Sequence, residues 1–480
     1  MVSPCLKQTW TVMGVLLNMF GQGMVLSYPS VILPALLSPH SIIKAEFHEA
    51  SWVASCIGFA GIPGFLSSSF LMEMYGRKKA HVAVLIPGIV GWLIIYFATS
   101  ISVLLCGRCL CGFAAAATVS LGAIIIGEYT SPKNRGMFLN LKTVAVCLGN
   151  MAVHILDHFF NWKTIALIAV IPHILALVII LTWPESPFWL ASKRRFEESQ
   201  KSFYWLRGNN KRAILEMEDL LRTQKEKLSQ YPEHVDNSNM IMDFIRKFKD
   251  RSFVKPLIIV CFAGLLLESC GRHIFPAFAM QIIGEITSDK SQSFYYTLGM
   301  DTIITASALF SSYLVKIMKR RTLLLGSGFI ALFVLFCVCL YMLLSAKGIV
   351  SNERTWIPIL LFTAYFILSN LGCTPIPLAL LGEIFPLAHR GAGSCVSGFI
   401  LCIYLMMAMQ ASSYLLVTVQ VYGTFAVFGL LMGISLIALY VILPETKDRT
   451  LQQIEHYFQT GKFRHDNLGI DEVNMKMLSS

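Results

Sequence analysis

Apolar runs recur along almost the whole of the 480-residue chain, separated by short polar connections. A helix of about 20 apolar residues crosses a hydrocarbon layer of roughly 30 Å, and each run reaches about that length. The pattern predicts twelve membrane-crossing helices, with approximate spans 11–36, 51–74, 81–99, 102–127, 137–157, 164–183, 254–283, 293–317, 322–345, 356–382, 392–417 and 421–443. We therefore expect an all-α membrane protein.

One long polar segment, residues 184–253, divides these crossings six and six. It contains FEESQKSFYWLRG and KRAILEMEDLLRTQKEKL, in which apolar and charged residues alternate at helical spacing. This spacing predicts short amphipathic helices on the inner membrane face. The segment is too short and too polar to bury a core of its own. The predicted domains are a six-helix bundle (1–183), a cytoplasmic linker (184–253), a second six-helix bundle (254–443) and a cytoplasmic tail (444–480).

Composition and charge support a membrane protein and orient it. Hydrophobic residues make up 55% of the chain and charged residues only 14%, whereas soluble domains carry roughly a quarter charged residues. The net charge of +11 does not indicate a nucleic-acid surface, because the cations gather at every second connection: residues 77–79, 133–135, 193–255, 316–321 and 390. This asymmetry predicts that both termini are cytoplasmic.

Two pairs of connections resemble one another at equivalent positions of the two halves. LMEMYGRKKA follows the second crossing and LVKIMKRRTLLL the eighth, and both place cations in a short turn. GEYTSPKNRG follows the fourth crossing and GEIFPLAHRG the tenth. Such repeats are typical of transporters built from two related halves. We expect two pseudo-symmetric bundles.

These motifs carry a family resemblance. GRKKA, GRCLCG, GEYTSPKNRG, PESPFWL, GEIFPLAHRG and PETKDRTLQQIE resemble the signatures of the sugar porter family of the major facilitator superfamily, in their expected places along nearly the whole chain. SWVAS at Ser51, and Thr143 where many members have glutamine, are most like the insect facilitated trehalose transporters. The resemblance implies the major facilitator fold and sugar transport by alternating access.

Charged residues at the cytoplasmic helix ends are candidates for a gate that closes the inner mouth. Such groups pair when the mouth is shut and separate when it opens, and interfacial anchoring is the alternative for any single member. The resemblance implies the same set: Glu73, Arg77, Arg108, Glu128, Arg135, Glu185, Arg320, Arg321, Glu383, Arg390 and Glu445.

The substrate-facing residues depart from the family pattern. Family members usually carry two glutamines and an asparagine in the seventh crossing, where this chain has Leu267, Glu268 and His273. Ile304, Leu401 and Leu378 replace two further asparagines and a tryptophan. Buried sugar hydroxyls need hydrogen-bond partners, and the remaining candidates are Gln22, Ser27, Tyr28, Thr143, Asn150, Glu268, His273, Gln281 and Asn370. Pro375 and Pro377 are expected to lie on the same pathway. Alternatively, the solute is a less polar compound or a glycoside.

Energy coupling and catalysis are constrained by what the chain lacks. Residues 11–37 contain no Asp or Glu, where proton-coupled relatives carry a carboxylate, and no Walker-type loop is present. Passive uniport is therefore favoured, and a non-transporting sugar sensor of the same fold stays open. We expect no enzyme activity, no cofactor and no metal, and a monomer in the plasma membrane. Glu268 and Arg272 stand four apart, which predicts an ion pair on one helix face.

Overall fold

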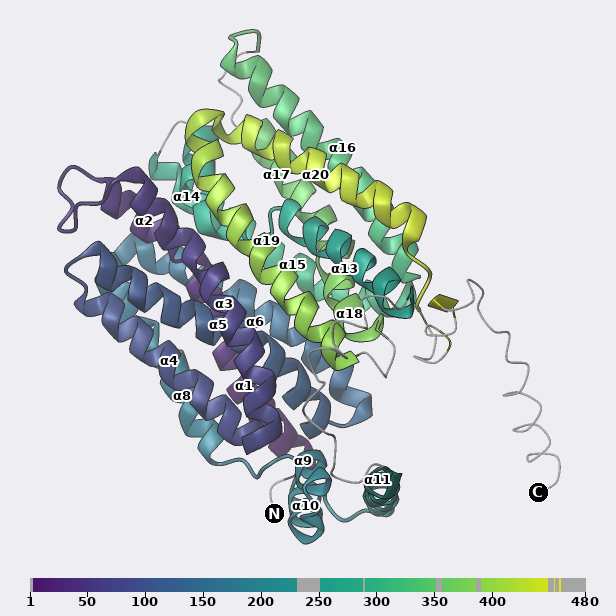
Figure 1. Cartoon of the computed structure of the whole chain (residues 1–480). Helices are drawn as coiled ribbons and strands as arrows, with labels where there is room; N and C mark the ends of the chain where they lie inside the picture. The colour runs from purple at the N-terminus through teal and green to yellow at the C-terminus, as the bar shows by residue number, and fades with distance from the viewer. Residues whose placement is uncertain are drawn as a thin grey trace.

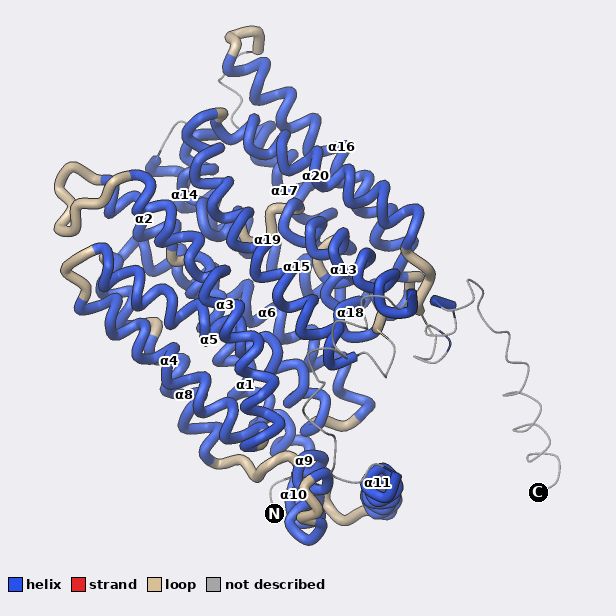
Figure 2. Tube along the Cα trace, viewed as in Figure 1, coloured by secondary structure: helices blue, strands red, loops and turns tan. Residues whose placement is uncertain are grey.

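The computed structural model describes residues 3–230, 251–287, 290–350, 356–385, 390–447, 453 and 457–458. Within these residues every regular element is a helix, and no strand occurs (Figure 2). Twelve stretches in the described part of the chain are long and apolar enough to cross a membrane. This confirms the predicted all-α class and the twelve crossings.

The first six crossings are formed by α1 to α8. Their boundaries lie within a few residues of the predicted spans, and the helices extend beyond most of those spans because their polar ends also continue the helix. Their bounds are α1 Pro4–Ser27, α2 Pro29–Leu37, α3 Phe47–Tyr75, α4 Arg77–Phe97, α5 Ile101–Tyr129, α6 Pro132–Phe159, α7 Trp162–Ile168 and α8 Val170–Leu181. The α1–α2 pair and the α7–α8 pair each form one crossing.

The last six crossings are formed by α13 to α20. Their bounds are α13 Arg251–Ser269, α14 Ile274–Thr287, α15 Lys290–Ile317, α16 Arg320–Ala346, α17 Trp356–Gly372, α18 Pro375–Glu383, α19 Arg390–Thr418 and α20 Gln420–Ile442. The α13–α14 pair and the α17–α18 pair each form one interrupted crossing.

Proline and glycine explain where the interrupted crossings break. Proline has no N–H and cannot continue the hydrogen-bond ladder, so new helices start at Pro29 and Pro375. Gly271 has a φ of +77° in the turn of residues 270–273 between α13 and α14. Glycine adopts this left-handed conformation without the steric cost that a side chain would add. These breaks bring backbone and turn residues into the middle of the protein.

Helices α1–α8 and α13–α20 lie as two groups side by side (Figure 1). In the first group α3 packs on α5 and α1 packs on α6; in the second α16 packs on α17 and α20. Gly23 and Gly149 bring α1 and α6 together closely, since a Cβ at either residue would collide with a backbone carbonyl of the other helix. The groups meet where α3 packs on α19, α6 on α15 and α2 on α14.

The outer helix faces are apolar. Phe333 on α16 is 70% exposed and Val441 on α20 is 74% exposed. Leu430, Ile434 and Ile437 add further exposed side chains along α20. In water such a surface would be costly, whereas in a bilayer it contacts lipid chains of similar polarity. The exposure pattern therefore fits a multi-pass integral membrane protein.

Three short helices follow the first six crossings: α9 Pro187–Ser192, α10 Phe196–Arg207 and α11 Lys211–Gln230. Phe203, Ala213 and Met217 are buried in a small apolar cluster that joins them. Gln8 of α1 donates to the Leu206 carbonyl at 3.2 Å, so this group lies against the end where α1 begins (Figure 1). Residues 231–250, which belong to the predicted linker, lie outside the described residues.

Candidate functional site

A central cavity lies between the two groups of helices, with about 630 Å³ of space between its lining atoms, part of which is open to solvent. Its walls come from α1 and α6 on one side, and from the 270–273 turn, α14, α15 and α17 on the other. Apolar lining residues include Leu26, Phe275 and Phe366. The polar lining residues are Thr143, Asn150, Arg272, His273, Asp301, Ser369, Asn370 and Thr374. An apolar wall with a few convergent polar groups is the usual composition of a small-molecule site.

Four residues predicted for the solute pathway line this cavity: Thr143, Asn150, His273 and Asn370. Asn150 Oδ1 and Ser369 Oγ are buried there without a hydrogen-bond partner among the described residues. Unpaired buried polar atoms cost free energy unless a ligand or water satisfies them. The cavity therefore offers free hydrogen-bonding groups from both halves.

The other predicted pathway residues do not line the central cavity. Ser27 and Tyr28 are buried in the first bundle, where Tyr28 Oη donates to the Trp162 carbonyl at 2.8 Å. Gln281 is exposed. Pro375 and Pro377 instead form the start of α18, directly after cavity residue Thr374.

Glu268 binds His273, which corrects the expected Glu268–Arg272 pair. The Glu268 carboxylate is buried and lies 2.8 Å and 3.0 Å from His273 Nδ1. Residues four apart share one face only in a continuous helix, but the chain leaves the helix at residues 270–273. That turn separates Arg272 from the face that carries Glu268. Arg272 Nη1 is buried and has no hydrogen-bond partner among the described residues.

A buried histidine–aspartate pair, which the sequence did not predict, joins the two halves. His154 of α6 and Asp301 of α15 lie 2.6 Å apart, with 1% and 5% of their side chains exposed. His154 Nε2 also lies 3.0 Å from the Pro276 carbonyl. A carbonyl oxygen only accepts, so Nε2 carries a hydrogen in either protonation arrangement. An isolated Asp inside a predicted crossing was the available signal, since intramembrane carboxylates are rare.

Residues of the first half that were predicted for the gate pair with one another. Arg77 binds both oxygens of Glu128, at 2.8 Å from Nε and 2.6 Å from Nη2. Glu185 accepts from the backbone N–H groups of Arg77 and Lys78, at 2.7 Å and 3.1 Å, at the start of α4. A carboxylate is favourable at a helix N-terminus because the N–H groups there lack helical partners. The hydrogen bonds of Glu185 thus hold the PESP motif against the turn between α3 and α4.

The remaining gate residues are less uniform. Glu445 accepts from the backbone N–H groups of Arg320 and Arg321, each at 3.1 Å, which repeats the Glu185 arrangement in the second half. Glu73 is exposed. Arg135 Nε is buried without a hydrogen-bond partner among the described residues. The side chains of Glu383 and Arg390 lie outside the described residues.

Arg108 does not belong with the gate, contrary to the prediction from its GRCLCG motif. It lies near the start of α5, whereas Glu128 lies at the other end of the same helix. Its side chain is fully buried, and it donates from Nε to the Val53 carbonyl at 3.0 Å and from Nη1 to the Val25 carbonyl at 2.9 Å. Arg108 therefore links three helices inside the first bundle.

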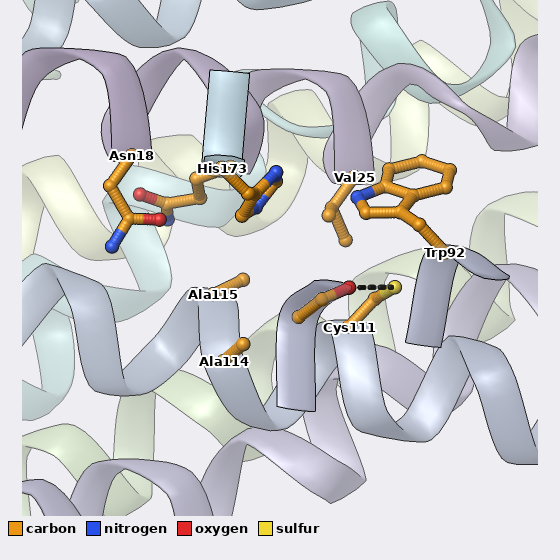
Figure 3. A pocket seen from close by; sticks show the side chains of 9 residues that line it. Asn18, Val25, Trp92, Cys111, Ala114, Ala115 and His173 are labelled. Carbon is orange, nitrogen blue, oxygen red and sulfur yellow. Dashed lines mark hydrogen bonds between the residues drawn. The ribbon is translucent and has the colours of Figure 1, made fainter. Parts of the chain in front are cut away.

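A second, smaller pocket lies inside the first bundle, where about 200 Å³ of space between the lining atoms leaves no room for a water molecule (Figure 3). The predicted pathway residue Gln22 lines it together with Asn18, Trp92 and His173. Asn18 Nδ2 lies 2.8 Å from a ring nitrogen of His81 and 3.0 Å from Thr118 Oγ1. The described lining comes from the first bundle alone, so this pocket is separate from the central cavity.

Sequence and structure comparisons give similar proteins over most of the chain. The facilitated trehalose transporter Tret1 of Polypedilum vanderplanki is 28% identical over 453 residues, covering 93% of this chain and 86% of that protein. Tret1 of Drosophila virilis is 26% identical over 88% of this chain, which spans only 46% of that longer protein. The inward-open xylose transporter XylE from E. coli matches with a TM-score of 0.73 and 15% identity, over 95% of this chain and 99% of that one.

These structural matches identify the fold as the twelve-helix major facilitator fold. The profile of the Sugar (and other) transporter family matches residues 10–458. That range includes every membrane crossing except the first few residues of α1. The chain is therefore a membrane transporter protein rather than an enzyme, and it belongs to the Sugar (and other) transporter family.

Proposed function

We propose that this protein is a facilitative transporter that moves a sugar, such as trehalose or a hexose, across a membrane by alternating access. The observation that carries the proposal is the central cavity, which both helix groups line and which contains unpaired polar atoms. The Tret1 relatives are named as facilitated trehalose transporters. A sugar hydroxyl entering the cavity would satisfy Asn150 and Ser369 in place of water.

The proposed mechanism rocks two bundles, residues 1–183 and 254–443, about the cavity. Support comes from the contacts: Arg77–Glu128 and Glu185–Arg77 lie within the first bundle, and Glu445–Arg320 lies within the second. Contacts between the bundles, such as His154–Asp301 and Ser55–Gln410, lie toward the opposite ends of the helices. Among the described residues, the side-chain hydrogen bonds that join the bundles thus lie away from the gate end, as rocking about the cavity requires.

The proposed orientation places both termini and the gate in the cytoplasm, as the distribution of cations predicts. The linker helices α9–α11 then lie at the inner membrane face, and the tail from residue 444 onward is cytoplasmic. We assign the protein to the plasma membrane, as a monomer with one pathway. Proteolysis from either side of oriented membranes checks the orientation, with cleavage of α10 expected only from the inner side.

A flux measurement tests the function. Purified protein in liposomes is expected to carry labelled trehalose or glucose with saturable kinetics, and an imposed proton gradient should leave the final internal concentration unchanged. Protein-free liposomes are the control. Accumulation that requires a proton gradient would contradict uniport. Saturable binding without flux would instead make the protein a sensor, and flux of glycosides alone would identify a less polar solute.

A further inference from the structure

The central cavity contains a guanidinium without a counter-ion. Arg272 lines the cavity from the turn between α13 and α14. Its Nη1 is buried, and its side chain makes neither a hydrogen bond nor an ion pair among the described residues. An unpaired cation inside a membrane protein is costly, and such residues default to functional roles.

The two carboxylates beside this cavity are already engaged by histidines. Glu268 binds His273, and Asp301 binds His154. The His154–Asp301 pair is electrically neutral, because the Pro276 carbonyl requires a hydrogen on Nε2 and the short Nδ1–Oδ2 contact requires one proton between its atoms. Neither arrangement of that proton leaves a net charge. Asp301 therefore does not supply the counter-ion for Arg272.

A second cation strengthens the positive field. Lys142 of α6 donates to the Val119 carbonyl at 3.3 Å, its one hydrogen bond among the described residues. The Glu268–His273 pair contributes no charge or one negative charge, depending on the imidazole proton. With Lys142 protonated, Lys142 and Arg272 together contribute two positive charges. The middle of the pathway thus keeps a positive excess in both cases.

We propose that the transported solute is a sugar acid, a polyhydroxylated molecule that carries one carboxylate bound by Arg272. The planar guanidinium forms paired hydrogen bonds with a carboxylate. Asn150 and Ser369, with unpaired acceptor or hydroxyl groups, provide partners for the hydroxyls. One carboxylate matches the single unpaired guanidinium of the cavity wall, whereas a phosphate dianion also requires Lys142, which does not line the cavity. This inference rests on the proposed transport function and specifies its substrate class.

The test compares glucuronate, glucose and glucose 6-phosphate, by binding to the purified protein and by flux into liposomes. We expect glucuronate to half-saturate the wild type at a concentration at least tenfold lower than glucose. Arg272→Gln should abolish this preference, and Arg272→Lys, which keeps the charge, should retain part of it. Lys201→Gln, at an exposed position on α10, is the matched control that keeps the preference.

Membrane potential gives a second readout. Uniport of a monoanion moves charge, so an inside-positive potential of about 60 mV should raise its equilibrium accumulation about tenfold, since 100 mV corresponds to about 2.3 kcal/mol per charge. Glucose accumulation should not respond. Glucuronate accumulation that does not respond to the potential would contradict uniport of the anion.

The outcomes separate the two claims. Glucose flux with no preference for glucuronate overturns the sugar-acid inference and leaves sugar transport standing. Preference for glucose 6-phosphate over glucuronate overturns the carboxylate assignment. Glucuronate binding that Arg272→Gln removes, without flux of any sugar, supports the anion site and contradicts transport. If the protein shows no binding and no flux, both the transport function and the sugar-acid inference are contradicted.

Discussion

His154→Leu is expected to lower the initial rate of sugar uptake at least tenfold, because it leaves Asp301 buried without its partner. The pair joins α6 to α15 at 2.6 Å, and less than a tenth of either side chain is exposed. Removing one member of a buried ion pair typically costs about 3–5 kcal/mol. That cost falls on the state in which these helices meet, so the balance between transporter conformations should shift. The initial rate of uptake per mole of reconstituted protein measures this effect.

The controls use the asymmetry of the pair. Asp301→Asn should be much milder, because an asparagine amide can donate to Nδ1 of a neutral His154 while Nε2 still binds Pro276. His154→Leu combined with Asp301→Leu should recover part of the lost stability, since an apolar pair replaces the stranded carboxylate. Wild-type uptake by the single His154→Leu variant would contradict a role for this contact between the halves.

Arg108→Leu is expected to destabilise the first bundle strongly and to reduce the yield of folded protein. Val25 would normally accept from the N–H of residue 29, but that residue is Pro29, which has no N–H. Arg108 Nη1 donates to the Val25 carbonyl instead, at 2.9 Å, and its guanidinium lies 5.7 Å from the Tyr28 ring centroid. An unsatisfied buried carbonyl costs about 1–3 kcal/mol, and a desolvated cation–π contact adds about 2 kcal/mol.

A double-mutant cycle tests whether Arg108 replaces the N–H donor that Pro29 lacks. Pro29→Ala restores an N–H that can bind the Val25 carbonyl, so Arg108→Leu should cost less in that background than in the wild type. The shift of the thermal unfolding midpoint in detergent, for all four proteins, gives the coupling. Equal costs in both backgrounds would show that Arg108 does not replace the missing proline donor.

The sequence predicts the crossings well and the interior of the crossings poorly. All twelve apolar runs are found within a few residues, since a run of about 20 apolar residues has few other uses. The breaks inside them were harder to locate. The turn at residues 270–273 interrupts the seventh crossing, so a spacing argument valid for one continuous helix gave the wrong partner for Glu268.

Side chains paired across the molecule are the second gap. His154 and Asp301 are 147 residues apart, and local spacing contains no information on such a contact. Arg108 shares a motif with cytoplasmic-end residues but lies at the other end of α5, because a motif does not state how far along a helix each residue lies. Thr143, Asn150, His273 and Asn370 were predicted for the pathway and line the cavity, since polar side chains within apolar runs are few.

A reversible cross-link between the halves tests the central claim, that solute passes because the two bundles move relative to each other. Thr302 Oγ1 of α15 lies 3.9 Å from Met151 Sδ of α6, so cysteines at both positions can be joined by a short methanethiosulfonate cross-linker, which reduction releases. The single variants Met151→Cys and Thr302→Cys control for the native cysteines, and mass spectrometry confirms the bond. Movement of the two bundles predicts that cross-linking abolishes sugar flux in the double variant and that reduction restores it. Undiminished flux through fully cross-linked protein would contradict it.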